Sequence, residues 1–210
     1  MTERGRRLRR WVVTGPVGAG KSLVTATLAD LGARVVDADA EGHAVLRDPD
    51  VVAEIAGAFG PECVQDGGVR RPVLADIVFA DAGALERLNR ITHPRLSARL
   101  VERLDALERA TAQPGLAVVE AAVYFLLPSF GPVDLVITVT APAEQRVARL
   151  VSSGRLDAAE ARARIAAQAD MMMDFERADV VLENTGTAEQ LRRAVAAVHE
   201  SHANGDSPGG

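Results

Sequence analysis

The stretch WVVTGPVGAGKS, from Trp11 to Ser22, restricts the fold of this chain more than any other part of the sequence. Its last eight residues, Gly15 to Ser22, match the phosphate-binding pattern G-x-x-x-x-G-K-[ST] at every defined position. An apolar, strand-like run precedes the match and a helical pattern follows it, which is the context that this pattern requires. The alternative is a glycine-rich turn in which the Lys-Ser pair occurs by chance.

The residue types in this loop suit the phosphates of a nucleotide. Glycines let successive backbone N–H groups curve around a phosphate, and the start of the following helix adds a partial positive charge. The hydroxyl of Ser22 can bind Mg²⁺ beside those phosphates. We therefore predict that ATP is bound by Gly15, Pro16, Val17, Gly18, Ala19, Gly20, Lys21 and Ser22.

Lys21 is the only lysine in the chain, so 23 of the 24 lysine and arginine residues are arginine. The ammonium group of a lysine is a compact point charge on a flexible stem, suited to bridging β- and γ-phosphates. A guanidinium group is a planar fork and would not fit the same cradle. We interpret the single lysine as a catalytic residue that arginine cannot replace.

The order of the periodic segments predicts an α/β fold with a five-stranded parallel sheet. Strand-like apolar runs cover residues 10–14, 33–39, 115–123, 133–142 and 178–186. Helical patterns cover residues 22–31, 50–59, 81–109 with a break near Pro94, 143–151, 158–169 and 188–201. This alternation is typical of a parallel sheet that helices cover on both faces. Ligands of such sheets bind at the carboxyl ends of the strands.

Composition and charge exclude several other functions. The length of 210 residues fits one domain, and the net charge of −5 argues against a nucleic acid partner held by bulk electrostatics. The longest apolar stretch, Leu116 to Leu127, contains Glu120 and is too short to cross a bilayer, so we expect no membrane partner. Cys63 is the only cysteine, which favours a reducing cytoplasm. The sequence leaves open whether the chain is a monomer or a small homo-oligomer.

Acidic residues at predicted strand ends are candidates for phosphoryl-transfer chemistry. Asp37 and Asp39 end the predicted second strand, where residues two apart point the same way. Asp39 could accept a hydroxyl proton or contact Mg²⁺ indirectly, or it could be a solvated turn or helix N-cap residue. Glu120 ends an apolar run and could act on the metal side of the loop or face water.

Segments spread over nearly the whole chain resemble those of the dephospho-CoA kinase family. The D-x-D of Asp37–Asp39, the R-x-x-L of Arg71–Leu74 and the pair His93-Pro94 are, at these spacings, more specific than the phosphate loop. The segments that carry the resemblance are TGPVGAGKS, LGARVVDAD, DGGVRRPVLADIVFAD, LNRITHPRL, APAEQRVARL, ARIAAQ and ADVVLENTG.

This resemblance implies a P-loop, adenylate-kinase-like core that transfers the γ-phosphate of ATP to the ribose 3′-hydroxyl of dephospho-CoA, with Mg²⁺ as cofactor. It implies a core at residues 10–50, 111–150 and 178–201, a substrate-binding helical region at about 50–110, and a lid at about 150–175. Residues 202–210 would be a disordered tail.

The same resemblance assigns roles to single residues. Asp39 becomes the candidate base, and Arg71 and His93 line the dephospho-CoA side, where we also place Glu120. Arg149 would reach the phosphates from the edge of the lid, and Asn184 and Gly186 would lie near adenine. An isolated histidine such as His93 can also be a helix cap or a satisfied core residue.

The sequence departs from the family pattern in three places. The family has a glutamate after the third strand, where this chain has Tyr124 or Leu126. Ser153 stands where the lid carries an arginine, and Asp174 stands where a basic residue precedes the last strand. We predict that Arg155, next to Gly154, takes over the displaced lid role.

Two other functions are compatible with the phosphate loop. A different P-loop nucleoside or nucleotide kinase would keep the cradle and phosphorylate another acceptor. A non-catalytic nucleotide- or CoA-binding relative would have lost turnover together with its lid contacts. The presence of Lys21, Ser22 and Asp39 argues against the second alternative.

Overall fold

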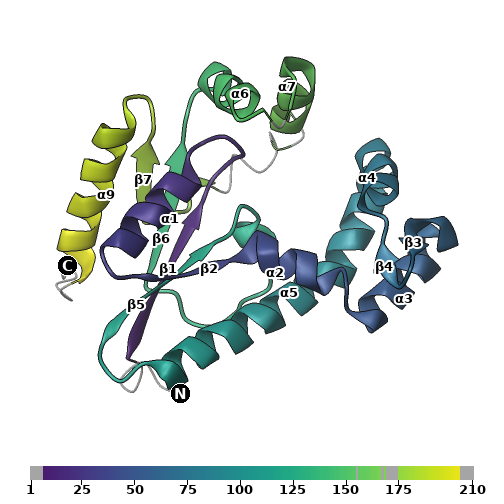
Figure 1. The fold of residues 1–210 in the computed structure, drawn as a ribbon, viewed down its shortest axis with the longest axis horizontal. Helices are drawn as coiled ribbons and strands as arrows, with labels where there is room; N and C mark the ends of the chain where they lie inside the picture. Colours follow the sequence, from purple (N-terminus) through teal and green to yellow (C-terminus); the bar gives the residue numbers. More distant parts are fainter. Residues whose placement is uncertain (1–6, 155, 167, 169–174, 204–210) are drawn as a thin grey trace. The chain divides into compact units, whose positions relative to one another are not determined.

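A computed structural model describes residues 7–154, 156–166, 168 and 175–203 of the chain (Figure 1). Helices separate most strands of the main sheet, as the sequence predicts, and several helices follow one another at residues 38–110 and 143–166. The strands are β1 (Leu8–Thr14), β2 (Arg34–Asp37), β3 (Val64–Gln65), β4 (Gly68–Val69), β5 (Gly115–Glu120), β6 (Leu135–Thr140) and β7 (Val180–Glu183). The α-helices are α1 (Lys21–Asp30), α2 (Ala38–Val45), α3 (Pro49–Phe59), α4 (Arg71–Ala80), α5 (Ala82–Ala110), α6 (Ala143–Ser152), α7 (Ala158–Ala166) and α9 (Ala188–Ala203).

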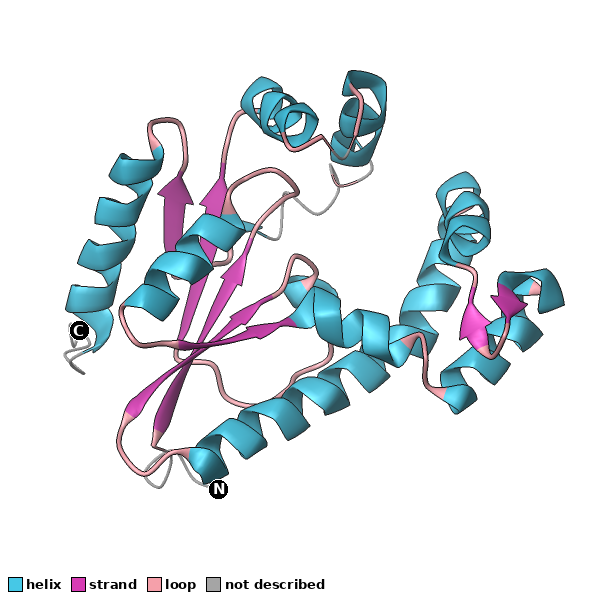
Figure 2. Cartoon of the chain, viewed as in Figure 1, coloured by secondary structure: helices cyan, strands magenta, loops and turns pink. Residues whose placement is uncertain are grey.

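Five strands form one parallel sheet in the order β2-β5-β1-β6-β7, which confirms the predicted fold class (Figure 2). The central strand is β1, and its Trp11 lies opposite Val118 of β5 and Leu135 of β6. Because β1 is paired on both sides, the loop that follows Thr14 leaves the middle of the sheet at its carboxyl edge. That is the place where open parallel sheets bind ligands.

The two faces of β1 are built differently, because successive side chains point to opposite faces of a strand. Trp11 and Val13 belong to the apolar cluster that α1 and α9 complete on one face (Figure 1). On the other face Arg10 forms an ion pair with Asp105 of α5 at 3.2 Å. Among the described helices, none is long and apolar enough to cross a membrane.

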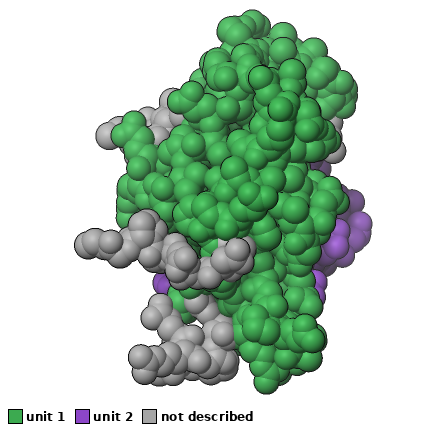
Figure 3. Space-filling view, turned by 90° about the vertical axis from the view of Figure 1, so that its left-hand side faces the viewer, with its two compact units in different colours: residues 1–36, 104–125, 132–210 green, residues 37–103, 126–131 purple. Residues whose placement is uncertain are grey.

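The chain divides into two compact units, coloured separately in Figure 3. Unit 1 comprises Met1–Val36, Leu104–Phe125 and Pro132–Gly210 and contains the sheet with α1, α6, α7 and α9. Unit 2 comprises Asp37–Arg103 and Leu126–Gly131 and contains α2, α3, α4, the β3–β4 hairpin and most of α5. The assignment of residues 50–110 to substrate binding and of 150–175 to a lid stays a proposal.

The structure corrects three local expectations. The second strand ends at Asp37, so Asp39 lies in the first turn of α2 and not on the strand. The helix α5 continues through Pro94, where the sequence suggested a break. The helix α4 and the short β3–β4 hairpin were not predicted, and α2 was considered only as the helix that Asp39 could cap.

A buried carboxylate fastens α2 to α5 within unit 2. The side chain of Glu41 is only 8% exposed and accepts hydrogen bonds from Arg99 Nε at 3.0 Å and Arg103 Nε at 2.5 Å. Burial alone would raise the pKa of Glu41, but the hydrogen bonds and charges of Arg103 and Arg99 together lower it below the usual value of a glutamate. The charged form is therefore favoured in the folded protein.

Glu41→Gln should lower the free energy of unfolding at pH 7 by about 1–3 kcal/mol, because hydrogen bonds between charged groups are lost. The lowered pKa stabilises the fold above the unfolded-state pKa, and this contribution is lost as the pH falls through the folded-state pKa. Urea unfolding of both proteins should therefore show a difference that shrinks below about pH 4.5. Glu86→Gln is the control, since Glu86 is 76% exposed and forms an ion pair with exposed Arg90; an equal loss there would contradict the argument.

Candidate functional site

The loop between β1 and α1 has the backbone of a phosphate cradle. Gly20 is the N-cap of α1 in the left-handed conformation, with φ at 109°, and Lys21 is the first helical residue. Ala19 N–H donates to Pro16 O at 3.2 Å, which closes the turn. The ammonium of Lys21 folds back over the loop and donates to Gly15 O at 2.9 Å and Pro16 O at 3.2 Å. Lys21 thus lies beside the loop, where a bound phosphate would meet it.

The loop passes so close to β6 that its first position admits only glycine. Gly15 has a φ of 135°, and a Cβ atom added there would lie 2.2 Å from the carbonyl oxygen of Val139. Because β6 is paired with β1 on one side and β7 on the other, its backbone atoms cannot move aside to relieve such a contact. This close approach fixes where the loop leaves the sheet.

Glu120 links the end of β5 to the first turn of α1. Its carboxylate accepts hydrogen bonds from Ser22 Oγ at 3.1 Å and Thr25 Oγ1 at 2.7 Å. The half-buried carboxylate therefore faces the phosphate loop, and the predicted alternative, a strand end that only faces water, does not describe it. A hydroxyl and a carboxylate side by side are oxygen ligands of the kind that Mg²⁺ takes together with substrate phosphates.

Arg149 and Asn184 hold the outer side of the loop. Arg149, in the last turn of α6, donates to Gly18 O at 3.4 Å, Ala19 O at 3.2 Å and Asn184 O at 2.9 Å. Asn184 is buried after β7 and donates its amide to Ala19 O at 2.8 Å. Both predicted residues therefore lie at the phosphate loop, and both contact its carbonyl groups.

A pocket of about 240 Å³ lies where β7 leads into α9. Asn184, Gly186 and Gln190 are among its lining residues, so two residues that we expected near adenine share one cavity. The backbone there is fixed by a capping box, in which Thr187 N–H donates to Gln190 Oε1 at 2.7 Å and Gln190 N–H donates to Thr187 Oγ1 at 3.2 Å.

Sequence reasoning missed three residues that contact this site. Arg146 Nε donates to Val17 O at 3.1 Å, Gln168 Oε1 accepts from Val17 N–H at 2.8 Å, and Thr25 donates to Glu120. Helical spacing could have indicated two of them. Thr25 follows Ser22 by three positions, and Arg146 precedes Arg149 by three, which places each pair on one helix face.

Asp39 and Arg71 belong to unit 2. The N-cap of α2 is Asp37, whose carboxylate accepts from Asp39 N–H at 2.8 Å and Ala40 N–H at 3.1 Å. Asp39 is therefore not the capping residue, and its carboxylate makes no side-chain hydrogen bond within the part of the chain that the structure describes. Arg71 is exposed and is the first residue of α4.

His93, also in unit 2, connects α5 to the segment after β5. Its Nδ1 lies 3.1 Å from the carbonyl oxygen of Leu126, and because a carbonyl only accepts, Nδ1 carries the proton. Burial lowers the pKa of His93, although the hydrogen bond to Leu126 acts in the opposite direction. The neutral ring leaves Nε2 as an acceptor. His93 is thus partly the satisfied histidine of the alternative interpretation, and Nε2 accepts no hydrogen bond from the residues that the structure describes.

The structure describes only some of the residues in the predicted lid. Arg155 and Asp174 lie outside the described residues. Ser153 is exposed and ends α6, and its hydroxyl donates to Leu150 O at 2.7 Å. The role that we predicted for Arg155 therefore stays a prediction.

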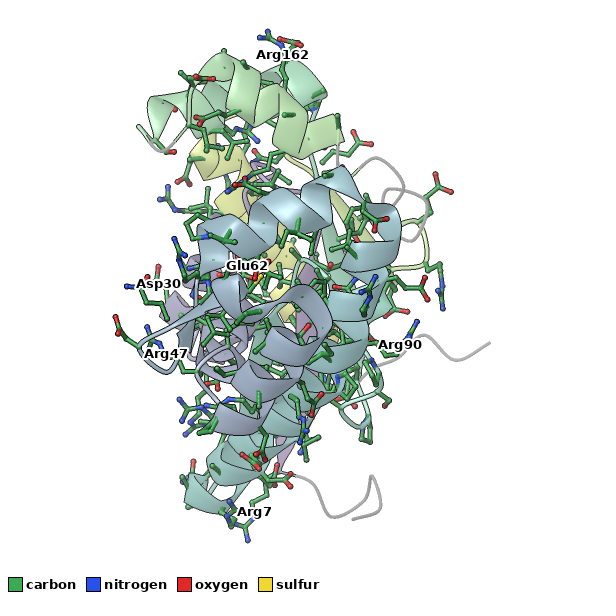
Figure 4. All side chains as sticks on the ribbon, turned by 90° about the vertical axis from the view of Figure 1, so that its right-hand side faces the viewer. Arg7, Asp30, Arg47, Glu62, Arg90 and Arg162 are labelled. Carbon is green, nitrogen blue, oxygen red and sulfur yellow. The ribbon has the colours of Figure 1, made fainter. Side chains whose placement is uncertain are left out.

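Cationic groups gather at the phosphate loop, although most arginines of the chain lie elsewhere. Figure 4 labels the exposed Arg47, Arg90 and Arg162, whose side chains point away from the ribbon. At the loop, by contrast, Lys21, Arg146 and Arg149 donate to backbone carbonyls, and Glu120 is the acidic side chain bonded to α1. This excess of positive charge suits an anionic ligand. Among the described residues, no cluster of three or more His, Cys, Asp or Glu side chains could hold a metal ion alone.

Comparisons with known proteins agree with this geometry. A family model described as dephospho-CoA kinase matches residues 11–190. A dephospho-CoA kinase of Moorella thermoacetica is 40% identical over 187 residues, covering 88% of each chain. One of Corynebacterium jeikeium is 41% identical, covering 87% of this chain and 94% of the relative. A crystal structure of a Thermus thermophilus protein has a TM-score of 0.74 at 34% identity, covering 94% of this chain and 99% of the other.

Gly15→Ala should disrupt the loop, because the new methyl group would meet Val139 O. We expect loss of ATP binding in calorimetry and a loss of stability well above that of the control, Gly32→Ala. Gly32 also has a positive φ, 95°, but no atom lies within 4 Å of an added Cβ, so backbone conformation alone should cost about 1–2 kcal/mol. If Gly15→Ala bound ATP with wild-type affinity, the close approach to β6 would not be a constraint.

Proposed function

We propose a role for each residue of the candidate site in the reaction that this chain catalyses. The chain belongs to the dephospho-CoA kinase family and catalyses the ATP-dependent phosphorylation of dephospho-CoA to coenzyme A. The family assignment favours this activity over the two alternatives, a P-loop kinase for another acceptor and a non-catalytic relative. The proposal rests on the structure of the phosphate loop. Its carbonyl groups accept hydrogen bonds from Arg146 and Arg149 of α6 and from Asn184.

ATP binds through its phosphates to the loop Gly15–Ser22. Backbone N–H groups and the N-terminus of α1 receive the negative charge. Lys21, whose ammonium lies over the loop at Gly15 O and Pro16 O, donates to the β- and γ-phosphate oxygens. The pocket with Asn184 and Gly186 is the proposed position of adenine.

The residues beside the loop fit a divalent cation, and we propose Mg²⁺. Ser22 Oγ and the Glu120 carboxylate, 3.1 Å apart, are the groups that would hold it, Ser22 directly and Glu120 by orienting that hydroxyl. When bound, the ion neutralises phosphate charge that develops during transfer. Thr25 keeps the carboxylate directed at Ser22, because it donates to the second carboxylate oxygen.

Asp39 is the proposed proton acceptor. The 3′-hydroxyl oxygen of dephospho-CoA bonds to the γ-phosphorus, the bond from that phosphorus to the bridging oxygen of ADP breaks, and the hydroxyl proton passes to the Asp39 carboxylate. Support comes from the division of roles in the D-x-D segment. Asp37 uses its carboxylate to cap α2, and the exposed Asp39 carboxylate stays available. Arg149 and Arg155 are the proposed arginines of the transition state.

The acceptor side of the reaction is proposed to use Arg71 and His93. Arg71 offers an exposed guanidinium for the diphosphate of dephospho-CoA. His93 offers a neutral ring with Nε2 free to accept a hydrogen bond, since Nδ1 donates to Leu126 O. The single cysteine and the net charge of −5 support a cytoplasmic location without a nucleic acid partner.

Replacing Lys21 tests the phosphate cradle. Lys21→Ala should abolish formation of coenzyme A from ATP and dephospho-CoA, because the charge that the lysine supplies is needed in the transition state. Lys21→Arg should also fail, because a planar guanidinium cannot bridge the same oxygens. A coupled assay measures the rate, and thermal melting checks that the fold is kept. A Lys21→Arg enzyme with a near-wild-type rate would contradict the cradle geometry.

Asp39→Asn tests the proton acceptor. It should lower kcat by about 100-fold or more, as losses of a general base typically do, and change ATP affinity much less. Asp37→Asn is the matched control, because asparagine caps a helix as well as aspartate and should leave stability and kcat nearly unchanged. If Asp39→Asn kept kcat and lost only stability, Asp39 would be a structural residue.

A further inference from the structure

Arg146 lies against the outer side of the phosphate loop in a way that no catalytic role requires. It is only 4% exposed, and its Nε donates to the carbonyl oxygen of Val17 at 3.1 Å. The backbone of α6 is equally close, since a Cβ atom added to Gly18 would lie 3.0 Å from Arg146 O. Arg146 therefore contacts the one peptide group between Val17 and Gly18 from outside the loop.

The geometry of a peptide group gives this contact a consequence. The peptide bonds of the described residues are trans, so the carbonyl of one residue and the N–H of the next point in opposite directions. With Val17 O directed outward to Arg146, the N–H of Gly18 is directed away from α6. That is the side on which a phosphate must meet it.

The Val17–Gly18 peptide group needs an external restraint, because glycine tolerates more than one orientation of it. Gly18 has a φ of 77°, and without a Cβ atom it can adopt negative φ values as readily. The next carbonyls, of Gly18 and Ala19, already accept from Arg149, and Ala19 O also accepts from Asn184. Arg146 provides the corresponding restraint at Val17.

Packing alone does not account for an arginine here. Burial lowers the pKa of Arg146, which means that the surroundings disfavour its charge. An apolar side chain of similar length would fill the same space without that cost but could not donate a hydrogen bond. The guanidinium is therefore retained for what it donates to.

We propose that Arg146 is a positioning residue for ATP: it holds the Val17 carbonyl outward and so keeps the Gly18 N–H directed toward the phosphates. The inference rests on the proposed role of the loop in binding ATP. It assigns Arg146 no contact with either substrate.

Arg146→Met tests this role, because methionine keeps much of the side-chain length and cannot donate. Calorimetry with ATP, without dephospho-CoA, should show an affinity about 10-fold weaker, the effect of one hydrogen bond from a charged donor. The KM for dephospho-CoA should stay unchanged. In ¹⁵N-labelled protein without nucleotide, the Gly18 amide resonance should shift. Arg146→Lys, which keeps a charge and a donor, should recover part of the affinity.

The matched control is Arg162→Met, which removes an exposed arginine of α7 that pairs with Glu144 of α6. It should leave ATP affinity and the Gly18 resonance unchanged. If Arg146→Met lowers the melting temperature but binds ATP like the wild type, Arg146 is only structural and the proposal is wrong. If Arg146→Met does not fold, Arg146→Lys decides, and wild-type affinity with an unshifted Gly18 resonance overturns the proposal.

The same measurements separate this inference from the proposed function. Failure of the wild-type enzyme to phosphorylate dephospho-CoA would count against the proposed function. The ATP affinity of Arg146→Met would still test the positioning role, because that titration contains no acceptor.

Discussion

The approach of Gly15 to the carbonyl of Val139 is the constraint on which the active site depends. A loop that must present N–H groups to a phosphate turns its carbonyls outward, and those carbonyls need partners because they are buried beside other elements. The central position of β1 supplies them: β6 leads into α6, which carries Arg146 and Arg149, and β7 leads into Asn184. The strand order thus brings residues more than 120 positions apart to one turn.

The regular part of this arrangement could be predicted from the sequence, because each sheet strand is a nearly continuous apolar run and the loop pattern defines the first strand and helix. The departures have identifiable physical causes. The hairpin β3–β4 has strands of two residues each around the positive-φ pair Asp66 and Gly67, too short to show periodicity. α5 continues through Pro94, and the buried Leu96 and Leu100, four residues apart on one face directly after it, contribute packing that offsets the one hydrogen bond that proline removes.

As with the fold, some residues of the candidate site could be predicted from the sequence and others could not. The roles of the side chains in the loop could be proposed from the sequence, because each has a chemical requirement that the pattern itself encodes. Arg146 and Thr25 lie outside that pattern: helical spacing places them on the same helix faces as Arg149 and Ser22, but it does not show that they contact Val17 O and Glu120. Asp37 and Asp39 illustrate the same limit. The spacing identifies the pair, but only the end of β2 at Asp37 shows that one aspartate caps a helix and the other remains available.

The distribution of cations around the loop also explains why a chain with 23 arginines has one lysine. On the outer side the acceptors are backbone carbonyls with fixed directions, and a rigid fork of donors can satisfy several of them, as Arg149 does with Gly18, Ala19 and Asn184. On the inner side the acceptors that we propose for Lys21 belong to a ligand, the phosphates of ATP. A flexible stem with three rotatable donors, which lies over the loop at Gly15 O and Pro16 O, suits such acceptors. Arginine is therefore used where the acceptors are fixed carbonyl groups of the protein, and lysine where we propose that the acceptors belong to the ligand.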